Sequence, residues 1–246
     1  MPQPLRRVKK VSGITWGAVL PARPQLASLI LDCITIWSQT EIRLGTLLAV
    51  ILRAEHGFAA VQMYLRLTSA DARRSVLDAA AKSMLSNDDY NLFSLTMKAL
   101  KPVRDRRNDF AHGLWGTAAE LPDALLWVAS DDYLAYGAVW LGASPKNQNG
   151  PGMLSPMFQA HEDHLDAIQV YRKSDLDSDT ARANEASLAA FYLTQALDSS
   201  FAGRDAIRQT LCQMRLIQAV LRPESAGEDK PSPPPQQPPE TPNETK

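Results

Sequence analysis

The sequence predicts a mainly α-helical protein that carries one β-hairpin insertion and ends in a disordered, proline-rich tail. Through most of the chain, apolar residues recur at the three- and four-residue spacing of a helix face. After Gly116 the pattern changes to two short apolar runs around a polar turn, which is typical of a hairpin. After Leu221 no aliphatic or aromatic residue larger than alanine occurs, so the end of the chain cannot offset its ordering entropy. The expected organisation is an irregular basic segment (1–22), a single helical domain (23–221) and a tail (222–246).

The first half of the chain contains clear helix start and stop signals. Pro24 suits the first turn of a long helix, which should end before Gly57. A shorter helix is expected over about 58–67. Thr68 or Ser69 can then cap the next helix, and the run Ser86-Asn87-Asp88-Asp89 marks a second break and cap, because a hydroxyl oxygen accepts a hydrogen bond from the exposed backbone N–H groups of a helix start.

The helix that follows Ser86 is long and contains Pro102, which should kink it or mark a new start. Gly113 is a reasonable terminator. The apolar runs that follow predict the hairpin near 124–140, and two further helices are expected over 175–200 and 204–221.

Composition restricts the classes of function. The chain has 26 Lys and Arg against 27 Asp and Glu, a net charge of −1, which argues against a protein that coats nucleic acid but not against a local basic pocket. Only Cys33 and Cys212 occur, so no disulfide framework or cysteine metal site is expected, and a cytoplasmic location fits. We expect neither a metal nor a cofactor. The longest apolar run, 44–52, is too short to cross a bilayer.

The densest group of polar side chains lies at the end of the long helix, over 104–113. Asn108 and His112 are four residues apart and share a helix face. The long side chain of Arg107 can bring its guanidinium towards the imidazole, and Arg104 adds a second cation. A histidine can move the protons and an arginine can hold the phosphate when a ribose 2′-OH attacks the adjacent phosphate, so the segment predicts RNA cleavage without a metal.

The run Arg107-Asn108-x-x-Ala111-His112 resembles the Arg-x4–6-His signature of HEPN domains (higher eukaryotes and prokaryotes nucleotide-binding). The resemblance covers roughly 26–115, so the hairpin and the last two helices lie outside the minimal domain. It implies a HEPN-like helical bundle that forms a homodimer, with two copies of the Arg/His pair facing a cleft. Many members are metal-independent ribonucleases of toxin–antitoxin, phage-defence or RNA-processing systems, and others bind nucleotides without cleaving them. RNA or a nucleotide is therefore an expected ligand, and an antitoxin or regulatory protein a possible partner.

Two interpretations of the motif remain open. In the first, the protein is an endoribonuclease with His112 as acid and base, Arg107 as phosphate clamp and Asn108 as a positioning group. In the second, it is a non-catalytic nucleotide-binding or protein-interaction module. Asn108 and His112 would then cap the helix end, and the arginines would pair with Asp105 and Asp109.

Glu41 is the other candidate site residue. It shares a helical stripe with Trp37 and other apolar residues, so its carboxylate should be partly buried and should need a partner. Arg107 or Arg104 is the natural candidate. The pair could orient the arginine for catalysis, or it could be a structural ion pair.

Overall fold

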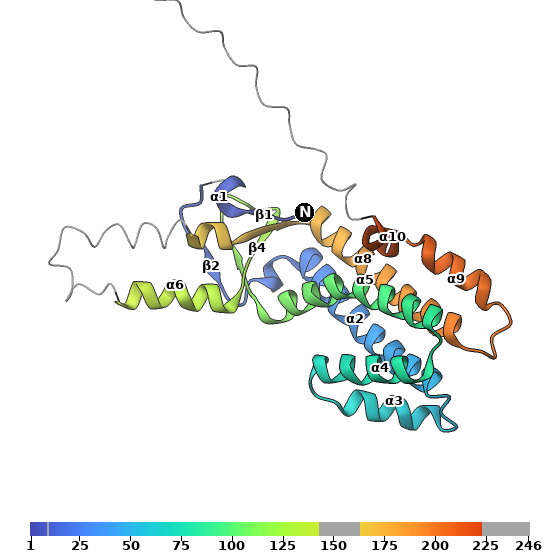
Figure 1. Ribbon diagram of the computed structural model, residues 1–246. Helices are drawn as coiled ribbons and strands as arrows, with labels where there is room; N and C mark the ends of the chain where they lie inside the picture. The colour runs from blue at the N-terminus through green and yellow to red at the C-terminus, as the bar shows by residue number, and fades with distance from the viewer. Residues whose placement is uncertain (9, 143–162, 223–246) are drawn as a thin grey trace, which may run out of the picture.

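The computed structural model describes residues 1–8, 10–142 and 163–222. Within these residues, a helical bundle carries a small antiparallel sheet at one end, so the prediction of a mainly α protein is confirmed (Figure 1). The predicted tail beyond Arg222 lies outside the described residues, and its disorder stays a prediction. None of the described helices is long and apolar enough to span a membrane.

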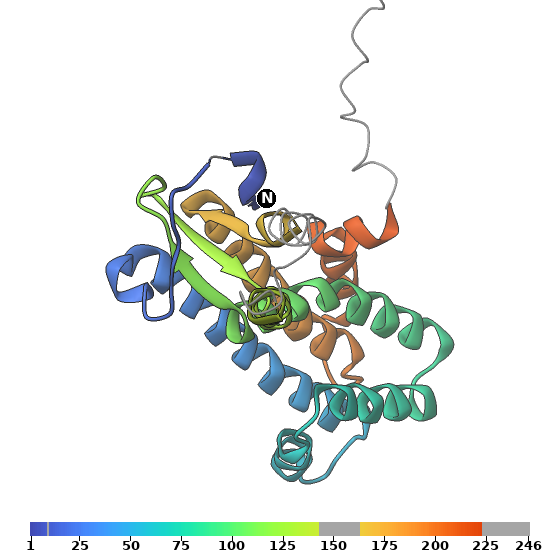
Figure 2. The same cartoon turned by 90° about the vertical axis from the view of Figure 1, so that its left-hand side faces the viewer.

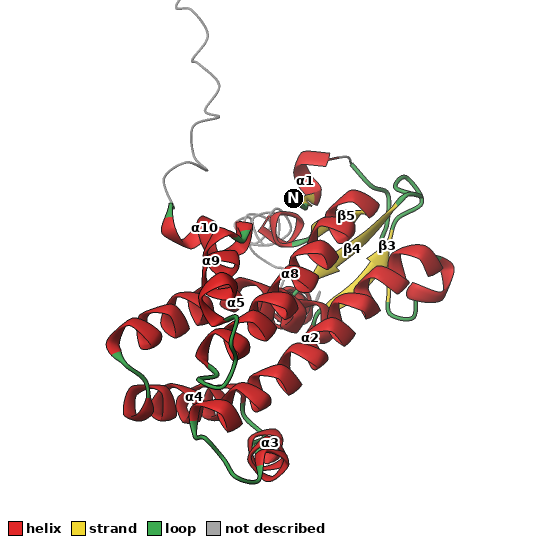
Figure 3. Cartoon of the chain, turned by 90° about the vertical axis from the view of Figure 1, so that its right-hand side faces the viewer, coloured by secondary structure: helices red, strands yellow, loops and turns green. Residues whose placement is uncertain are grey.

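The helices of the bundle follow the order expected from the capping signals, and their positions can be followed in Figure 3. They are α2 (Pro24–Ile51), α3 (Gly57–Arg66), α4 (Ala70–Met84), α5 (Asn87–His112), α8 (Lys173–Leu197), α9 (Arg204–Gln213) and α10 (Arg215–Leu221). Pro24 occupies the first turn of α2, and the hydroxyls of Ser69 and Ser86 accept hydrogen bonds from Ala72 N and Asp89 N. Pro102 lies inside α5 without ending it.

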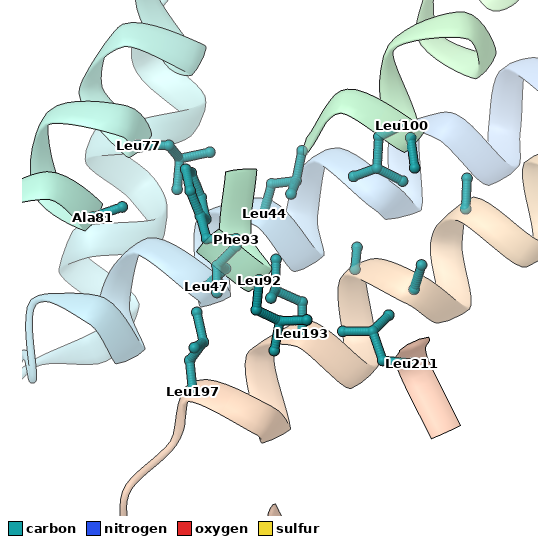
Figure 4. Packing of buried hydrophobic residues seen from close by; sticks show 14 of the residues in the cluster. Leu44, Leu47, Leu77, Ala81, Leu92, Phe93, Leu100, Leu193, Leu197 and Leu211 are labelled. Carbon is teal, nitrogen blue, oxygen red and sulfur yellow. The ribbon is translucent and has the colours of Figure 1, made fainter. Parts of the chain in front are cut away.

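The pair α2 and α8 forms the centre of the bundle. The buried face of α8 is rich in alanine, and small side chains let two helix backbones approach closely. Leucines and Phe93 from α2, α4, α5 and α8 fill the space around this pair (Figure 4). This core holds the first part of α5 in place, while the sheet holds its last turn.

The sheet has the strand order β1-β5-β4-β3-β2. Its strands are β1 (Gln3–Pro4), β2 (Thr15–Trp16), β3 (Leu114–Thr117), β4 (Ala124–Val128) and β5 (Gln169–Arg172), all paired antiparallel. The longer strands β3, β4 and β5 lie side by side in Figure 2. Successive residues of β4 alternate between faces: Leu125 packs towards the helices, whereas Leu126 and Val128 pack on the opposite face. Because both faces are covered, β4 has the continuous apolar sequence of a buried strand.

The predicted hairpin near 124–140 is wrong in its second arm. Its first arm is β4, but Ser130–Gly142 forms the helix α6, which extends away from the bundle (Figure 1). The strand partners of β4 are β3 and β5. Asp131 and Asp132 lie in the first turn of α6, where carboxylates favour a helix start. The polar residues interpreted as a turn therefore begin a helix.

The first 22 residues differ from the expected irregular lead-in. They contribute β1, β2, the one-turn helix α1 (Leu5–Val8) and a 3-10 turn, η1 (Leu20–Ala22). Leu5 is only 1% exposed in the apolar cluster on the outer face of the sheet. The helix expected over 204–221 is also divided, because Met214 has an extended backbone between α9 and α10.

Candidate functional site

All but one of the predicted site residues line a single cleft of about 380 Å³ beside α5. Arg104, Arg107 and Asn108 face it from α5, since residues three and four apart share a helix face. Glu41 faces it from α2. The ends of α3 and α4 close the cleft with a group that includes Leu65, Thr68, Ala70 and Arg73. We call this space the α5 cleft.

Glu41 is held by three donors, none of them the arginine that the sequence suggested. Its carboxylate accepts hydrogen bonds from Trp37 Nε1 at 3.1 Å, Tyr64 Oη at 3.2 Å and Arg73 Nη1 at 3.1 Å. The expected pairing with Arg104 or Arg107 is therefore wrong, and Arg73 is the partner. Burial, together with the charge of Glu41, raises the pKa of Tyr64, so the phenol stays protonated and can donate.

Arg73 is a site residue that the sequence did not single out. Besides Glu41, its guanidinium donates to the carbonyl oxygens of Leu65 and Leu67, and so it fastens the α3–α4 connection to α2. The only signal in the sequence is a buried carboxylate without a local partner. That signal does not distinguish one distant arginine from another.

The two α5 arginines of the cleft have different surroundings. Arg104 donates to Asp105 from Nε and Nη2, at 3.3 and 3.1 Å. Burial opposes the charge of Asp105, but hydrogen bonds from Lys101 and Arg104 outweigh it and lower the pKa of this carboxyl. Arg107 donates from Nη1 to Asn108 Oδ1 at 3.0 Å, whereas its Nε is buried and bonded to none of the described residues. Its Nη2 also makes no hydrogen bond with the described residues, so this nitrogen, rather than the buried Nε, keeps hydrogen-bonding capacity for another acceptor.

His112 lies outside the α5 cleft, at the last position of α5, and its side chain is exposed. Its backbone carbonyl accepts a hydrogen bond from Ser130 Oγ, while its imidazole bonds to none of the described residues. In a helix, a separation of five residues corresponds to about 7.5 Å along the axis and about 140° around it. Accordingly, the side chains of His112 and Arg107, both among the described residues, form no hydrogen bond with each other. The structure brings Arg107 to Asn108 and leaves His112 one turn beyond Asn108.

Two tryptophans fix the end of α5 against the sheet. Trp127 Nε1 donates to the carbonyl of Asp109 at 2.9 Å, and Trp115 Nε1 donates to that of Phe110 at 3.2 Å. Gly113 follows directly, with φ −81°, so it ends the helix without a left-handed backbone. A Cβ atom at Gly113 would lie 1.9 Å from Trp127 Nε1. The glycine is therefore required by the close approach of the indole, and the position of His112 depends on this contact.

Arg106 points to the opposite side of α5 and is a structural residue. It donates to Tyr171 Oη at 2.6 Å and lies 3.5 Å from Asp109 Oδ2 and 3.6 Å from Asp179 Oδ2. Burial raises the pKa values of Asp109 and Asp179, although the charge of Arg106 lowers them. The suggested pairing of the motif's arginines with Asp105 and Asp109 thus occurs, through Arg104 and Arg106.

Among the described residues, no group of three or more His, Cys, Asp or Glu side chains could hold a metal ion. Searches of protein-family models, curated proteins and solved structures found no match to this chain.

Proposed function

We propose that the protein is a HEPN-type endoribonuclease that cleaves RNA by internal attack of the 2′-OH and acts as a homodimer. The observation that supports this proposal is that the last two turns of one fixed helix carry both an arginine with a spare donor and an exposed histidine. Asn108, between them, accepts a hydrogen bond from Arg107 and would keep its guanidinium oriented.

In the proposed reaction, the neutral imidazole of His112 removes the proton from the ribose 2′-OH. The 2′-oxygen forms a bond to phosphorus, and the bond from phosphorus to the 5′-oxygen breaks. An imidazolium then gives a proton to the leaving 5′-oxygen, so the products are a 2′,3′-cyclic phosphate and a 5′-hydroxyl. The guanidinium of Arg107 would hold the phosphate by two parallel hydrogen bonds and stabilise the charge of the transition state.

The test is incubation of the purified protein with mixed RNA in EDTA, with product ends identified by mass spectrometry. We expect cyclic phosphate ends, and a rate about two to four orders of magnitude lower for His112→Ala, the usual loss of a general acid or base. Arg107→Ala should be similarly impaired, and Arg107→Lys should restore little, because an ammonium cannot make the two-pronged contact.

His56→Ala is the matched control, because His56 is another exposed histidine and lies outside the α5 cleft. It should keep the wild-type rate. His112→Ala should also keep the wild-type melting temperature, since its exposed imidazole bonds to none of the described residues. A folded His112→Ala protein that cleaves RNA at the wild-type rate would end the catalytic proposal.

Two observations favour the alternative, a non-catalytic nucleotide-binding or protein-interaction module. His112 lies outside the α5 cleft, and Arg104 is already paired with Asp105. This alternative predicts no RNA cleavage by any of these proteins. It also predicts that Arg107→Ala lowers the melting temperature, as expected for a structural arginine.

A further inference from the structure

A second cavity, of about 430 Å³, lies on the other side of α5, between this helix, α8 and α10. We call it the α8–α10 cavity. Four arginines line it: Arg106 and Arg107 from α5, Arg182 from α8 and Arg215 from α10. The acidic residues of its lining are Asp179 and Glu185. The cavity thus has an excess of positive charge, in a protein whose net charge is −1.

Three of the lining arginines form no ion pair with the described residues: Arg107, which donates only to the neutral amide oxygen of Asn108, and two exposed arginines, Arg182 and Arg215. Arg106 is engaged by Tyr171 and Asp179, and Glu185 accepts a hydrogen bond from Leu216 N at 2.8 Å. Arg182 and Arg215, in contrast, make no hydrogen bond or ion pair with any residue that the structure describes. The bond between Glu185 and Leu216 joins α8 to α10 next to both arginines and so holds the two helices together.

The rest of the lining offers an apolar wall and a buried acceptor. The wall includes Val103, Leu216 and Val220, with Ala99 and Pro102. Asp179 is 8% exposed, and its Oδ2 has no hydrogen bond among the described residues. A cavity with an apolar wall and a few convergent polar groups has the usual character of a small-molecule site.

We propose that the α8–α10 cavity binds a small phosphate monoester. Its phosphate would lie between Arg182 and Arg215, and its organic part against the apolar wall. A monoester carries close to two negative charges at neutral pH, which matches two unpaired guanidinium groups, and arginine binds phosphate by paired hydrogen bonds. The cavity shares Arg107 with the proposed cleavage site, but neither Asn108 nor His112 lines it, and the proposed anion contacts are those of Arg182 and Arg215.

The test uses phenyl phosphate, inorganic phosphate and phenol as probes of the full chain in isothermal titration calorimetry. We expect phenyl phosphate to bind about tenfold more tightly than inorganic phosphate, because burial of half of a phenyl ring favours binding by roughly that factor. Phenol should bind more weakly than phenyl phosphate. Affinity for phenyl phosphate should fall between pH 7.5 and pH 5, as the dianion takes up a proton with a pKa of about 6.

Arg182→Gln/Arg215→Gln should lower the affinity for phenyl phosphate about a hundredfold, and each single variant about tenfold. The matched control is Arg7→Gln/Arg66→Gln, which removes two exposed arginines that line neither this cavity nor the α5 cleft. It should bind like the wild type. His112→Ala should also bind like the wild type, so a failure of the ribonuclease proposal and a failure of this one are distinguishable.

Three results would overturn the proposal. The first is no binding of phenyl phosphate by the wild type. The second is equal losses in the Arg182/Arg215 and Arg7/Arg66 variants, which would show binding to diffuse surface charge. The third is phenol binding as tightly as phenyl phosphate, which would show an apolar site without anion recognition. The four substituted arginines are exposed, so every variant should fold with the wild-type circular dichroism spectrum.

Discussion

Gly113 controls how α5 meets the sheet. A methyl group there would overlap the indole of Trp127 and break its hydrogen bond to the Asp109 carbonyl. We expect Gly113→Ala to lower the free energy of unfolding by about 2–3 kcal/mol, through overpacking and a lost buried hydrogen bond. Urea denaturation measures this change.

The matched control is Gly137→Ala in α6. A Cβ atom there meets nothing within 4 Å among the described residues. Alanine is better than glycine inside a helix by up to about 1 kcal/mol, so this variant should be as stable as the wild type or more stable. Equal losses in the two glycine variants would contradict the role given to Trp127.

The arginines around the α5 cleft should differ in their contribution to stability. Arg73→Ala leaves the partly buried carboxylate of Glu41 without its cation and frees two backbone carbonyls. We expect a loss of about 3 kcal/mol in the free energy of unfolding. Arg104→Ala removes only a pairing with the neighbouring Asp105 and should cost less than about 1 kcal/mol. Thermal and urea denaturation of both variants measure these losses. A larger loss for Arg104→Ala than for Arg73→Ala would contradict the role given to Arg73.

At the scale of single residues, the sequence predicts which of these side chains lie together but only some of their contacts. The clustering of Arg104, Arg107 and Asn108 follows from helical spacing, and the structure places them together with Glu41 in one cleft. The partner of Glu41 could not be predicted from the sequence. Arg73 is 32 residues away from Glu41 in the chain, so their ion pair depends on how α2, α3 and α4 pack. Periodicity within a single helix contains no information on that packing.

Ion pairs between Asp89 and two arginines hold the helix α9 against the start of α5. Asp89, in the first turn of α5, accepts hydrogen bonds from Arg204 and Arg208 of α9 and from Ser86 Oγ. Burial by itself would raise the pKa of Asp89, but the hydrogen bonds from Arg208 and Ser86 and the charges of both arginines outweigh it, so this pKa is lowered. A carboxyl whose pKa is lowered by folding stabilises the folded state above its unfolded pKa. This stabilisation is lost as the pH falls through the folded value.

Asp89→Asn should therefore lower the free energy of unfolding at pH 7 by about 1–3 kcal/mol, the contribution of hydrogen bonds to charged groups. The difference between variant and wild type should shrink as the pH falls from about 5 towards 3. Urea denaturation at a series of pH values measures it. Asp88→Asn, at the exposed neighbouring position, is the matched control and should lower the free energy of unfolding at pH 7 by less than Asp89→Asn does. A difference in the free energy of unfolding that stays constant over the whole pH range would contradict the stabilising role of the Asp89 ion pairs.

The helices were easier to predict than the sheet, for a physical reason. Capping signals and the spacing of apolar residues are local, so the starts of α2, α4 and α5 follow from Pro24, Ser69 and Ser86. The strands β1 and β2 are two residues each and lie at the two edges of the sheet. They form by pairing with β5 and β3, which are distant from them in the chain. The apolar run of α6 fits either a strand or a helix, and it forms a helix whose first turn contains two aspartates. Short apolar runs of this kind cannot be assigned from periodicity alone.

At the scale of the whole molecule, α5 connects the helical bundle to the sheet. Its first part packs in the bundle core, and its last carbonyls bind two indoles near the sheet. His112 is thereby presented on a rigid end rather than on a loose loop, and rigid elements hold catalytic groups more accurately. The homodimer stays a prediction. Light scattering at micromolar concentration should report twice the mass of the chain, and a monomer would count against the proposed ribonuclease.

The separation of Arg107 from His112 within one chain leads to a sharper prediction about the dimer. Because helix geometry places them about 140° apart around α5, the proposed site should combine Arg107 of one protomer with His112 of its partner. A heterodimer of Arg107→Ala and His112→Ala protomers then has one complete site and one that lacks both groups. Co-expressed with two different affinity tags and purified through both, it should cleave RNA at about half the wild-type rate, although each variant alone is inactive.

The matched control is a heterodimer of a wild-type protomer with an Arg107→Ala/His112→Ala protomer. It contains the same four side chains in total, but each site now lacks either its arginine or its histidine if the pair is shared between protomers. This heterodimer should be inactive. If both residues of a site come from the same protomer, the results reverse: the control keeps about half of the activity and the first heterodimer has none. The two rates, measured on the same RNA in EDTA, therefore decide which protomer supplies the histidine.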